Sequence, residues 1–185
     1  MEKAMKNMKS VLKRVILPAA FVLAATAIVP WEADPVATAA SPDDLAAAGW
    51  ELAWSDEFEA DKLDDTKWER CKRGTPDWKN TMSGDPRLLE IKDGVLHLWG
   101  IVNDKKDSDP APFLTAGVTS KGKYAFRYGK VQIRARLKSA QGAWPALWML
   151  GVEKRWPANG EIDLMEHLNF DQKIYQTVHS DYTHK

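Results

Sequence analysis

A chain of 185 residues has the length of one ordinary domain, and its 44% apolar residues and nine tryptophans are enough for a globular core. Basic and acidic residues balance at 26 each, so no strong electrostatic field points to nucleic acid or to an anionic membrane surface. The single cysteine, Cys71, excludes an intrachain disulfide framework, and we expect it to be a bystander thiol rather than a nucleophile.

The first forty residues carry the features of a secretory signal peptide in the usual order. A basic start precedes an almost uncharged apolar run at residues 15–29, and the small residues 37–40 offer a cleavage site. A membrane span needs ~20 apolar residues, so this run is short for an anchor, although an uncleaved anchor is the alternative. We therefore predict a signal peptide at residues 1–40, a secreted or periplasmic mature protein, and no stable membrane insertion after cleavage.

The rest of the chain predicts a short linker followed by a β-rich domain. Residues 41–49 are expected to form a linker or a single helical turn. Beyond them the apolar residues gather in short runs separated by Gly, Pro and Asp, which is typical of strands. These runs are residues 52–54, 88–91, 95–99 and 129–137. Asp93-Gly94 predicts a hairpin turn, and residues 131–137 alternate as in a half-buried strand. The pattern predicts an all-β antiparallel sandwich without a long amphipathic helix.

Three carboxylates, Glu161, Asp163 and Glu166, lie within six residues and are separated by large apolar side chains. On a helix they would point in different directions, with Glu161 and Asp163 about 200° apart. On a strand Glu161 and Asp163 share one face, while Ile162 and Leu164 point into a core. Glu166 then misses that face by one residue. A β-bulge at Leu164 or the residue after it restores Glu166, and bulges are over-represented beside active sites.

The residues around this run favour sugar chemistry. Two carboxyls about 5–5.5 Å apart suit retaining glycoside hydrolysis, and a concave sheet would bring Glu161 and Glu166 toward that separation. Trp144 and Trp148 lie four residues apart, on one face of a strand, and flat indole rings pack against sugar rings. The alternative readings are scattered surface acids and tryptophans that belong to the core.

The sequence resembles glycoside hydrolase family sixteen, which includes laminarinases, lichenases, agarases and carrageenases. The resemblance is carried by QGAWPALWMLG, then WPANGEIDLMEHLN, then YQTVHSDYT, with the acids in the bulged spacing E-x-D-x-x-E. Earlier matches are WSDEF, LDDTKW, KDGVLHL and FRYGKV, so the resemblance covers residues 50–183 in order.

This resemblance implies a β-jelly roll with a concave substrate cleft. It further implies that Glu161 is the nucleophile, Glu166 the general acid/base and Asp163 the residue between them. His179 matches a position beside the acid/base on the adjacent strand. No cofactor is required by such chemistry. The resemblance also implies a structural Ca²⁺ near the positions that match Glu57 and Gly94, which are the candidate metal-binding residues. No second histidine stands at metal-ligand spacing, so no zinc site is expected.

The family domain usually continues beyond the point where this chain stops, at Lys185. We therefore expect residues 50–185 to be a catalytic domain truncated at its C-terminus, which folds poorly alone and is monomeric when complete. The predicted substrate is β-1,3 or mixed-linkage glucan, and no nucleic-acid partner is expected. The alternatives are a galactan hydrolase for agar, porphyran or carrageenan, a transglycosylase, and a non-catalytic polysaccharide-binding or inactive fragment. Sulfated galactans would favour a basic cleft, for which the candidates are Arg127, Arg134 and Arg136.

Overall fold

The computed structural model describes residues 40–184. The predicted signal peptide lies outside these residues, apart from Ala40. Within the described residues, no helix has the length and apolar character needed to cross a bilayer. The chain divides into two compact units, which are described separately. The first comprises residues up to Asp61 with Ile91–Val95 and Arg127–Arg136, and the second comprises Lys62–Glu90, Leu96–Phe126 and Leu137–Lys185.

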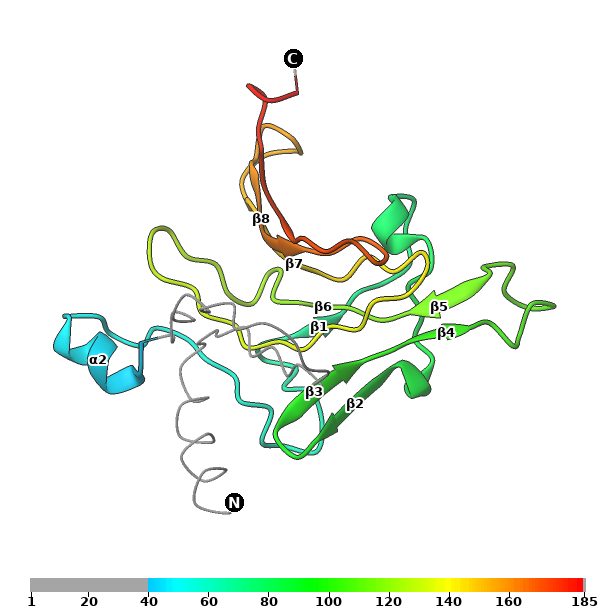
Figure 1. The fold of residues 1–185 in the computed structure, drawn as a ribbon, viewed down its shortest axis with the longest axis horizontal. Helices are drawn as coiled ribbons and strands as arrows, with labels where there is room; N and C mark the ends of the chain where they lie inside the picture. Colours follow the sequence, from blue (N-terminus) through cyan, green and yellow to red (C-terminus); the bar gives the residue numbers. More distant parts are fainter. Residues whose placement is uncertain (1–39, 185) are drawn as a thin grey trace, which may run out of the picture. The chain divides into compact units, whose positions relative to one another are not determined.

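Short strands dominate the described chain (Figure 1). The helical segments are α2 (Pro42–Ala47), η2 (Asp77–Lys79) and η3 (Pro86–Leu88). The strands are β1 (Glu69–Arg70), β2 (Leu89–Lys92), β3 (Val95–Leu98), β4 (Gly100–Val102), β5 (Phe113–Thr115), β6 (Val118–Thr119), β7 (Ala146–Leu150), β8 (Glu161–Glu166) and β9 (Tyr175–His179). They form the pairs β1-β6, β2-β3 and β4-β5 and the three-stranded sheet β7-β8-β9. The prediction of an all-β fold built from antiparallel strands is confirmed.

The first turns of the domain follow from local sequence. Ser41 caps α2, because its hydroxyl accepts the Asp44 N–H at 3.1 Å while the Asp44 carboxylate accepts the Ser41 N–H at 2.9 Å. Residues 42–47 therefore take the helical alternative that the sequence allowed. Between β2 and β3, Asp93 and Gly94 have φ angles of 53° and 69°. Two positive φ angles fit the two-residue hairpin turn that was predicted at this position.

Two predicted strands are not formed. Residues 52–54 and 131–137 take no regular strand, although the second run alternates between apolar and polar residues. Alternation specifies which side chains share a face, but a strand also needs a neighbouring backbone to pair with its N–H and C=O groups. None of the strands within residues 40–184 pairs with either run, so the prediction was wrong there.

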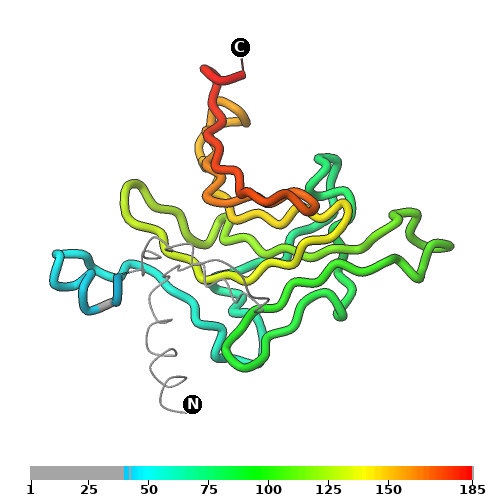
Figure 2. The backbone as a smooth tube through the Cα atoms, in the orientation of Figure 1, coloured from blue at the N-terminus to red at the C-terminus, as the bar shows by residue number. Residues whose placement is uncertain are grey.

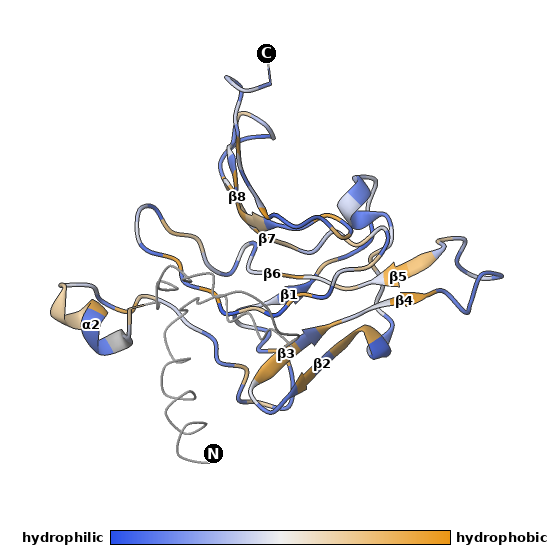
Figure 3. Cartoon of the chain, in the orientation of Figure 1, coloured by the Kyte–Doolittle hydropathy of each residue, from blue (hydrophilic) through white to orange (hydrophobic). Residues whose placement is uncertain are grey.

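The buried apolar side chains of the described chain all lie in the second unit. They are Leu88, Leu114 and Met165. Figure 3 shows apolar residues along the paired strands β4 and β5, where Leu114 contributes to this core. On β8, by contrast, Ile162 is 45% exposed, and its partner on β9, Val178, is 61% exposed. The expectation that Ile162 points into a core was therefore wrong, whereas Asp163 and Met165 are buried.

Candidate active site

The register of the three-stranded sheet places all three acids on one face. Figure 2 follows the chain through β7, β8 and β9, from yellow to red. Along β9 the burial alternates, so Tyr175, Thr177 and His179 share one face. Their partners on β8 are Glu166, Asp163 and Glu161, in that order. Two residues lie between Asp163 and Glu166 on β8 while only one lies between their partners on β9, so the predicted bulge is confirmed at this point.

The bulge itself is held by a side chain of the neighbouring strand. The amide of Gln176 donates to the carbonyl of Leu164 at 3.0 Å, which satisfies an acceptor inside the irregular segment. On the other side of β8, Ala146 of β7 pairs with Glu166 and Trp148 pairs with Asp163. Both edges of β8 therefore fix the register that gathers the carboxylates.

Each glutamate accepts a hydrogen bond from a different tryptophan. Trp144 Nε1 donates to Glu166 Oε1 at 2.7 Å, and Trp156 Nε1 donates to Glu161 Oε2 at 2.6 Å. Hydrogen bonds to an ionised carboxylate are shorter and stronger than neutral ones, so the indoles orient the two acids. Trp144 was predicted from the sequence as a sugar platform. The contact of Trp156 was not predicted, since nothing in a sequence shows which way an indole N–H points.

The two tryptophans are themselves braced. The segment of Trp144 is tied to the chain beyond β8 by Asn169, whose N–H donates to the Ala143 carbonyl at 2.8 Å and whose Oδ1 accepts the Gly142 N–H at 2.6 Å. These bonds join residues that precede β7 to residues that follow β8. They fix the approach of Trp144 to the acid that it contacts.

Asn159 organises the loop of Trp156. Its Oδ1 accepts the N–H groups of Glu153 at 2.9 Å and Lys154 at 2.6 Å, and its Nδ2 donates to the Gly151 carbonyl. The backbone of Gly151 runs so close that a Cβ added there would lie 1.9 Å from the Asn159 carbonyl oxygen. Only glycine fits this approach without a shift of the loop.

Asp163 lies buried between the two glutamates of the site. It is 4% exposed, and burial raises the pKa of its carboxyl, with the nearby charge of Glu161 acting in the same direction. The imidazole of His179 opposes this rise and lies with Nε2 3.2 Å from Asp163 Oδ2, without the geometry of a regular hydrogen bond. Ligand-type atoms of Glu161, Asp163 and His179 all lie within 4.8 Å of one another. The site therefore gathers two carboxylates and one imidazole in a close cluster.

His184 joins this group, although no sequence pattern predicted a role for it. A turn begins after β9, where Ser180 N–H donates to Thr183 Oγ1 at 2.8 Å and His184 N–H donates to the Ser180 carbonyl at 3.2 Å. The turn brings His184 Nε2 to 2.8 Å from His179 Nδ1 and its ring to 4.7 Å from the ring of Trp156. A serine followed three residues later by threonine was the signal that could have indicated this return.

Trp148, the second predicted sugar platform, lies inside β7 and opposite Asp163. Its ring meets the edge of Trp78 with centroids 4.8 Å apart and planes at 79°. Trp78 belongs to η2 and was not predicted as part of the site. The contact connects the loop of η2 to the strand that lies beside the acids.

The remaining candidates belong to the first unit. A Cβ added at Gly94 would lie 3.6 Å from the Glu57 carbonyl oxygen and 3.7 Å from Glu59 Oε1, so oxygen atoms do gather at the position carried over for calcium. Arg127 stacks over the ring of Tyr128 at 5.3 Å. Arg134 and Arg136 lie in the same unit as these residues, whereas the three acids lie in the second unit.

Comparisons with known proteins show what the chain is similar to. The family described as XgeA-like, catalytic GH16 domain matches residues 115–185. A keratan-sulfate endo-1,4-beta-galactosidase of Sphingobacterium multivorum is 38% identical over 141 residues, which cover 74% of this chain and 33% of that protein. A beta-glucanase of Rhodothermus marinus is 36% identical over 71% of this chain and 49% of that protein. A glucan endo-1,3-beta-glucosidase A1 of Niallia circulans is 35% identical over 68% of this chain and 21% of that protein.

Solved structures give the same picture of the fold. SCLam, a non-specific endo-beta-1,3(4)-glucanase from family GH16, aligns with a TM-score of 0.59 at 26% identity, over 71% of this chain and 54% of that one. A structure reported with endo-acting O-glycanases of the human gut microbiota aligns with a TM-score of 0.60 at 28% identity, over 72% and 54%. The expected jelly-roll class is thereby confirmed. The chain spans about half or less of the length of each relative described here.

Proposed function

Because the chain belongs to glycoside hydrolase family sixteen, we propose that it cleaves internal β-glycosidic bonds of a polysaccharide by double displacement with retention. The observation that carries this proposal is the bulged strand β8, whose register places Glu161, Asp163 and Glu166 on one face. Glu161 is the nucleophile and Glu166 is the general acid and base.

The chemical steps follow from these roles. The Glu161 carboxylate attacks the anomeric carbon while Glu166 gives its proton to the leaving glycosidic oxygen, so one C–O bond forms as the other breaks. Glu166, now ionised, takes a proton from water, and that water releases the sugar from Glu161. Trp156 and Trp144 hold the two carboxylates in these positions. Asp163 supplies a buried carboxyl next to Glu161, and a proton retained there keeps negative charge from accumulating beside the nucleophile.

The proposed substrate is a β-1,3 or mixed-linkage glucan. The beta-glucanase of Rhodothermus marinus, the endo-1,3-beta-glucosidase A1 of Niallia circulans and SCLam support this class. A galactan is the second candidate, supported by the 38% identity with the keratan-sulfate endo-galactosidase. Transglycosylation uses the same two steps with a sugar in place of water, and accumulation of products longer than the donor would identify it.

Reducing-sugar release from laminarin, barley β-glucan and agarose tests the proposal directly, with Glu166→Gln as the inactive control. NMR of the first product from the active enzyme should show the β-anomer before mutarotation. Release that survives in Glu166→Gln, or an α-anomer as the first product, would contradict the assigned roles.

Export, assembly and calcium complete the proposal. The basic and apolar leader supports secretion or a periplasmic location, which suits a polymer too large to enter a cell. A monomer is proposed for the complete domain. The Glu57 carbonyl and the Glu59 carboxylate beside Gly94 would contribute oxygens to a structural Ca²⁺, an ion that takes six to eight oxygen ligands.

A further inference from the structure

A solvent-open cavity of about 510 Å³ lies in the second unit, among residues to which no role has been given. Its walls come from β1 and the residues that follow it, and from the short segment Met82–Gly84. The side chain of Asp109 completes the lining. None of the three acids of β8 lines this cavity.

The cavity has a positive net charge. Three cations and two carboxylates line it. Lys72 pairs with Glu69 at 2.7 Å, and Arg73 makes a two-pronged pair with Asp109, whose second contact is 2.7 Å. Arg70 is the cation that remains, because no carboxylate within residues 40–184 forms an ion pair with it.

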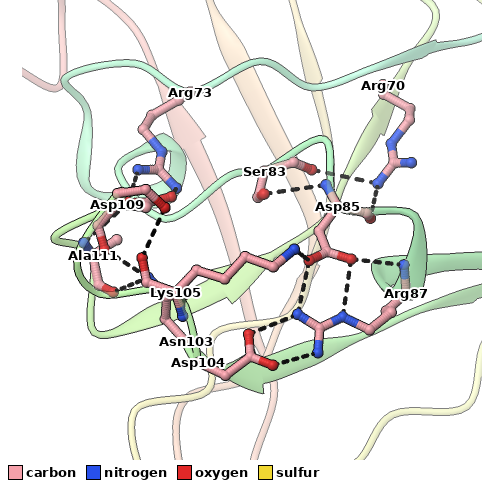
Figure 4. Close-up of polar contacts among 11 residues, drawn as sticks. Arg70, Arg73, Ser83, Asp85, Arg87, Asn103, Asp104, Lys105, Asp109 and Ala111 are labelled. Carbon is pink, nitrogen blue, oxygen red and sulfur yellow. Dashed lines mark hydrogen bonds and ion pairs between the residues drawn. The ribbon is translucent and has the colours of Figure 1, made fainter.

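The guanidinium of Arg70 is fixed in place while most of its donors stay unused. Figure 4 shows Arg70 reaching back to the chain, where Nη2 donates to the carbonyls of Ser83 at 3.4 Å and Asp85 at 3.0 Å. Its Nε is buried and has no hydrogen-bond partner, so the N–H groups of Nη1 are the donors left for a ligand. A guanidinium has five N–H donors in a rigid fork that matches the oxygens of a sulfate or a carboxylate. The side chain is therefore held ready for an anion that the protein itself does not supply.

The segment between β1 and β2, which contains η2, connects the cavity to the strands that carry the acids. Trp78, in the middle of the loop, contacts Trp148, which pairs with Asp163 on β8. Met82 on the cavity wall is four positions after Trp78, and an extended chain covers at most about 14 Å over that length. The cavity wall and the sheet that carries the acids are therefore joined by one short segment of chain.

From these observations we infer that the cavity binds an anionic substituent of the polysaccharide, a sulfate ester or a carboxylate, through Arg70. This inference rests on the proposed glycosidase function and, of the two substrate classes proposed above, it favours the second, a galactan that carries sulfate, over a neutral glucan. The binding site is separate from the reacting atoms, so it selects the substrate and takes no part in bond cleavage.

Calorimetry with the full chain carrying Glu166→Gln, which blocks turnover, measures the binding. The probes are oligosaccharides of a sulfated galactan, the same oligosaccharides after chemical desulfation, and oligosaccharides of a polyuronate. We expect one of the two anionic probes to bind about tenfold more tightly than the desulfated probe, and the anionic probe that does so identifies the substituent. The difference should shrink as salt is added.

Substitutions at two positions, Arg70 and Gly84, test whether the preference for the anionic probe arises at this cavity. Arg70→Gln should remove the preference for the anionic probe. Arg70 also donates to two backbone carbonyls, so a second pair of variants tests the site while leaving Arg70 in place. A Cβ added at Gly84, which lines the cavity, meets nothing within 4 Å. Gly84→Glu therefore adds a carboxylate at the cavity, and Gly84→Gln is its neutral match. Gly84→Glu should weaken binding of the anionic probe about fivefold relative to Gly84→Gln.

The outcomes separate this inference from the proposed function. Equal affinity for the anionic and neutral probes, or equal behaviour of the two Gly84 variants, would overturn the anion site even in an active glycosidase. Charge-dependent binding by a chain that cleaves no polysaccharide would support the anion site and reject the hydrolase instead.

Discussion

The indole N–H of Trp144 offers a sharp test of how the site is oriented. In Trp144→Phe the aromatic face remains, while the 2.7 Å hydrogen bond to Glu166 is lost. A hydrogen bond to a charged group contributes about 1.5–3 kcal/mol, and Trp144 is 49% exposed, so water replaces part of it and the lower end applies. A loss of about 1.5 kcal/mol in the transition state corresponds to roughly a tenfold decrease in kcat/KM. Steady-state reducing-sugar assays on the polysaccharide that the parent cleaves measure this decrease in kcat/KM.

The control is the same substitution at Trp99, whose indole stacks on His97 and donates no hydrogen bond to the three acids. Trp99 follows β3, is 41% exposed and stacks on His97, so Trp99→Phe should leave kcat/KM within about twofold of the parent. Thermal melts of both variants check that each folds. If Trp144→Phe matches Trp99→Phe in turnover, the indole does not orient Glu166 and the reasoning fails.

Two further predictions concern stability. Because burial raises the pKa of Asp163, the folded state binds its proton more tightly than the unfolded state does, so the contribution of Asp163 to the free energy of unfolding should fall as pH rises through the interval between the ordinary aspartate pKa and the raised one. Asp163→Asn lacks this contribution, so the free energy of unfolding of the parent minus that of the variant should fall over the interval, and the variant should match or exceed the parent's stability at pH 7 while losing activity. A difference that rises over that interval would contradict the direction. In Gly151→Ala the added methyl collides with the Asn159 carbonyl, which should cost about 2 kcal/mol or roughly 4–8 °C in Tm, whereas Gly84→Ala in open space should change Tm by less than about 2 °C.

The sequence predicted best where the information is local. The Asp93-Gly94 turn requires two positive φ angles, and the chain adopts them. The bulge before Glu166 could be predicted because side chains alternate along a strand, so three carboxylates at this spacing reach one face only if one residue is extra.

The sequence predicted least where distant segments meet. Residues 131–137 alternate correctly, yet alternation carries no information about a pairing partner. The loop before β8 carries Trp156 and Asn159, and the turn after β9 carries His184. The paths of both segments depend on hydrogen bonds between residues several positions apart. Arg70 likewise has no motif around it, and its free donors become visible only when its two carbonyl partners are known.

The two tryptophan contacts also show what the bulge in β8 achieves for the site. A nucleophile and an acid/base must stay distinct although both are glutamates on one strand. Without the extra residue, Glu166 would face the side that carries Ile162, because a shift of one residue moves a side chain to the opposite face. With it, Glu161 meets an indole from the loop before β8 and Glu166 meets one from the segment before β7. The two carboxylates thus receive their orientation from separate parts of the chain, and a change in one support should leave the other acid in position.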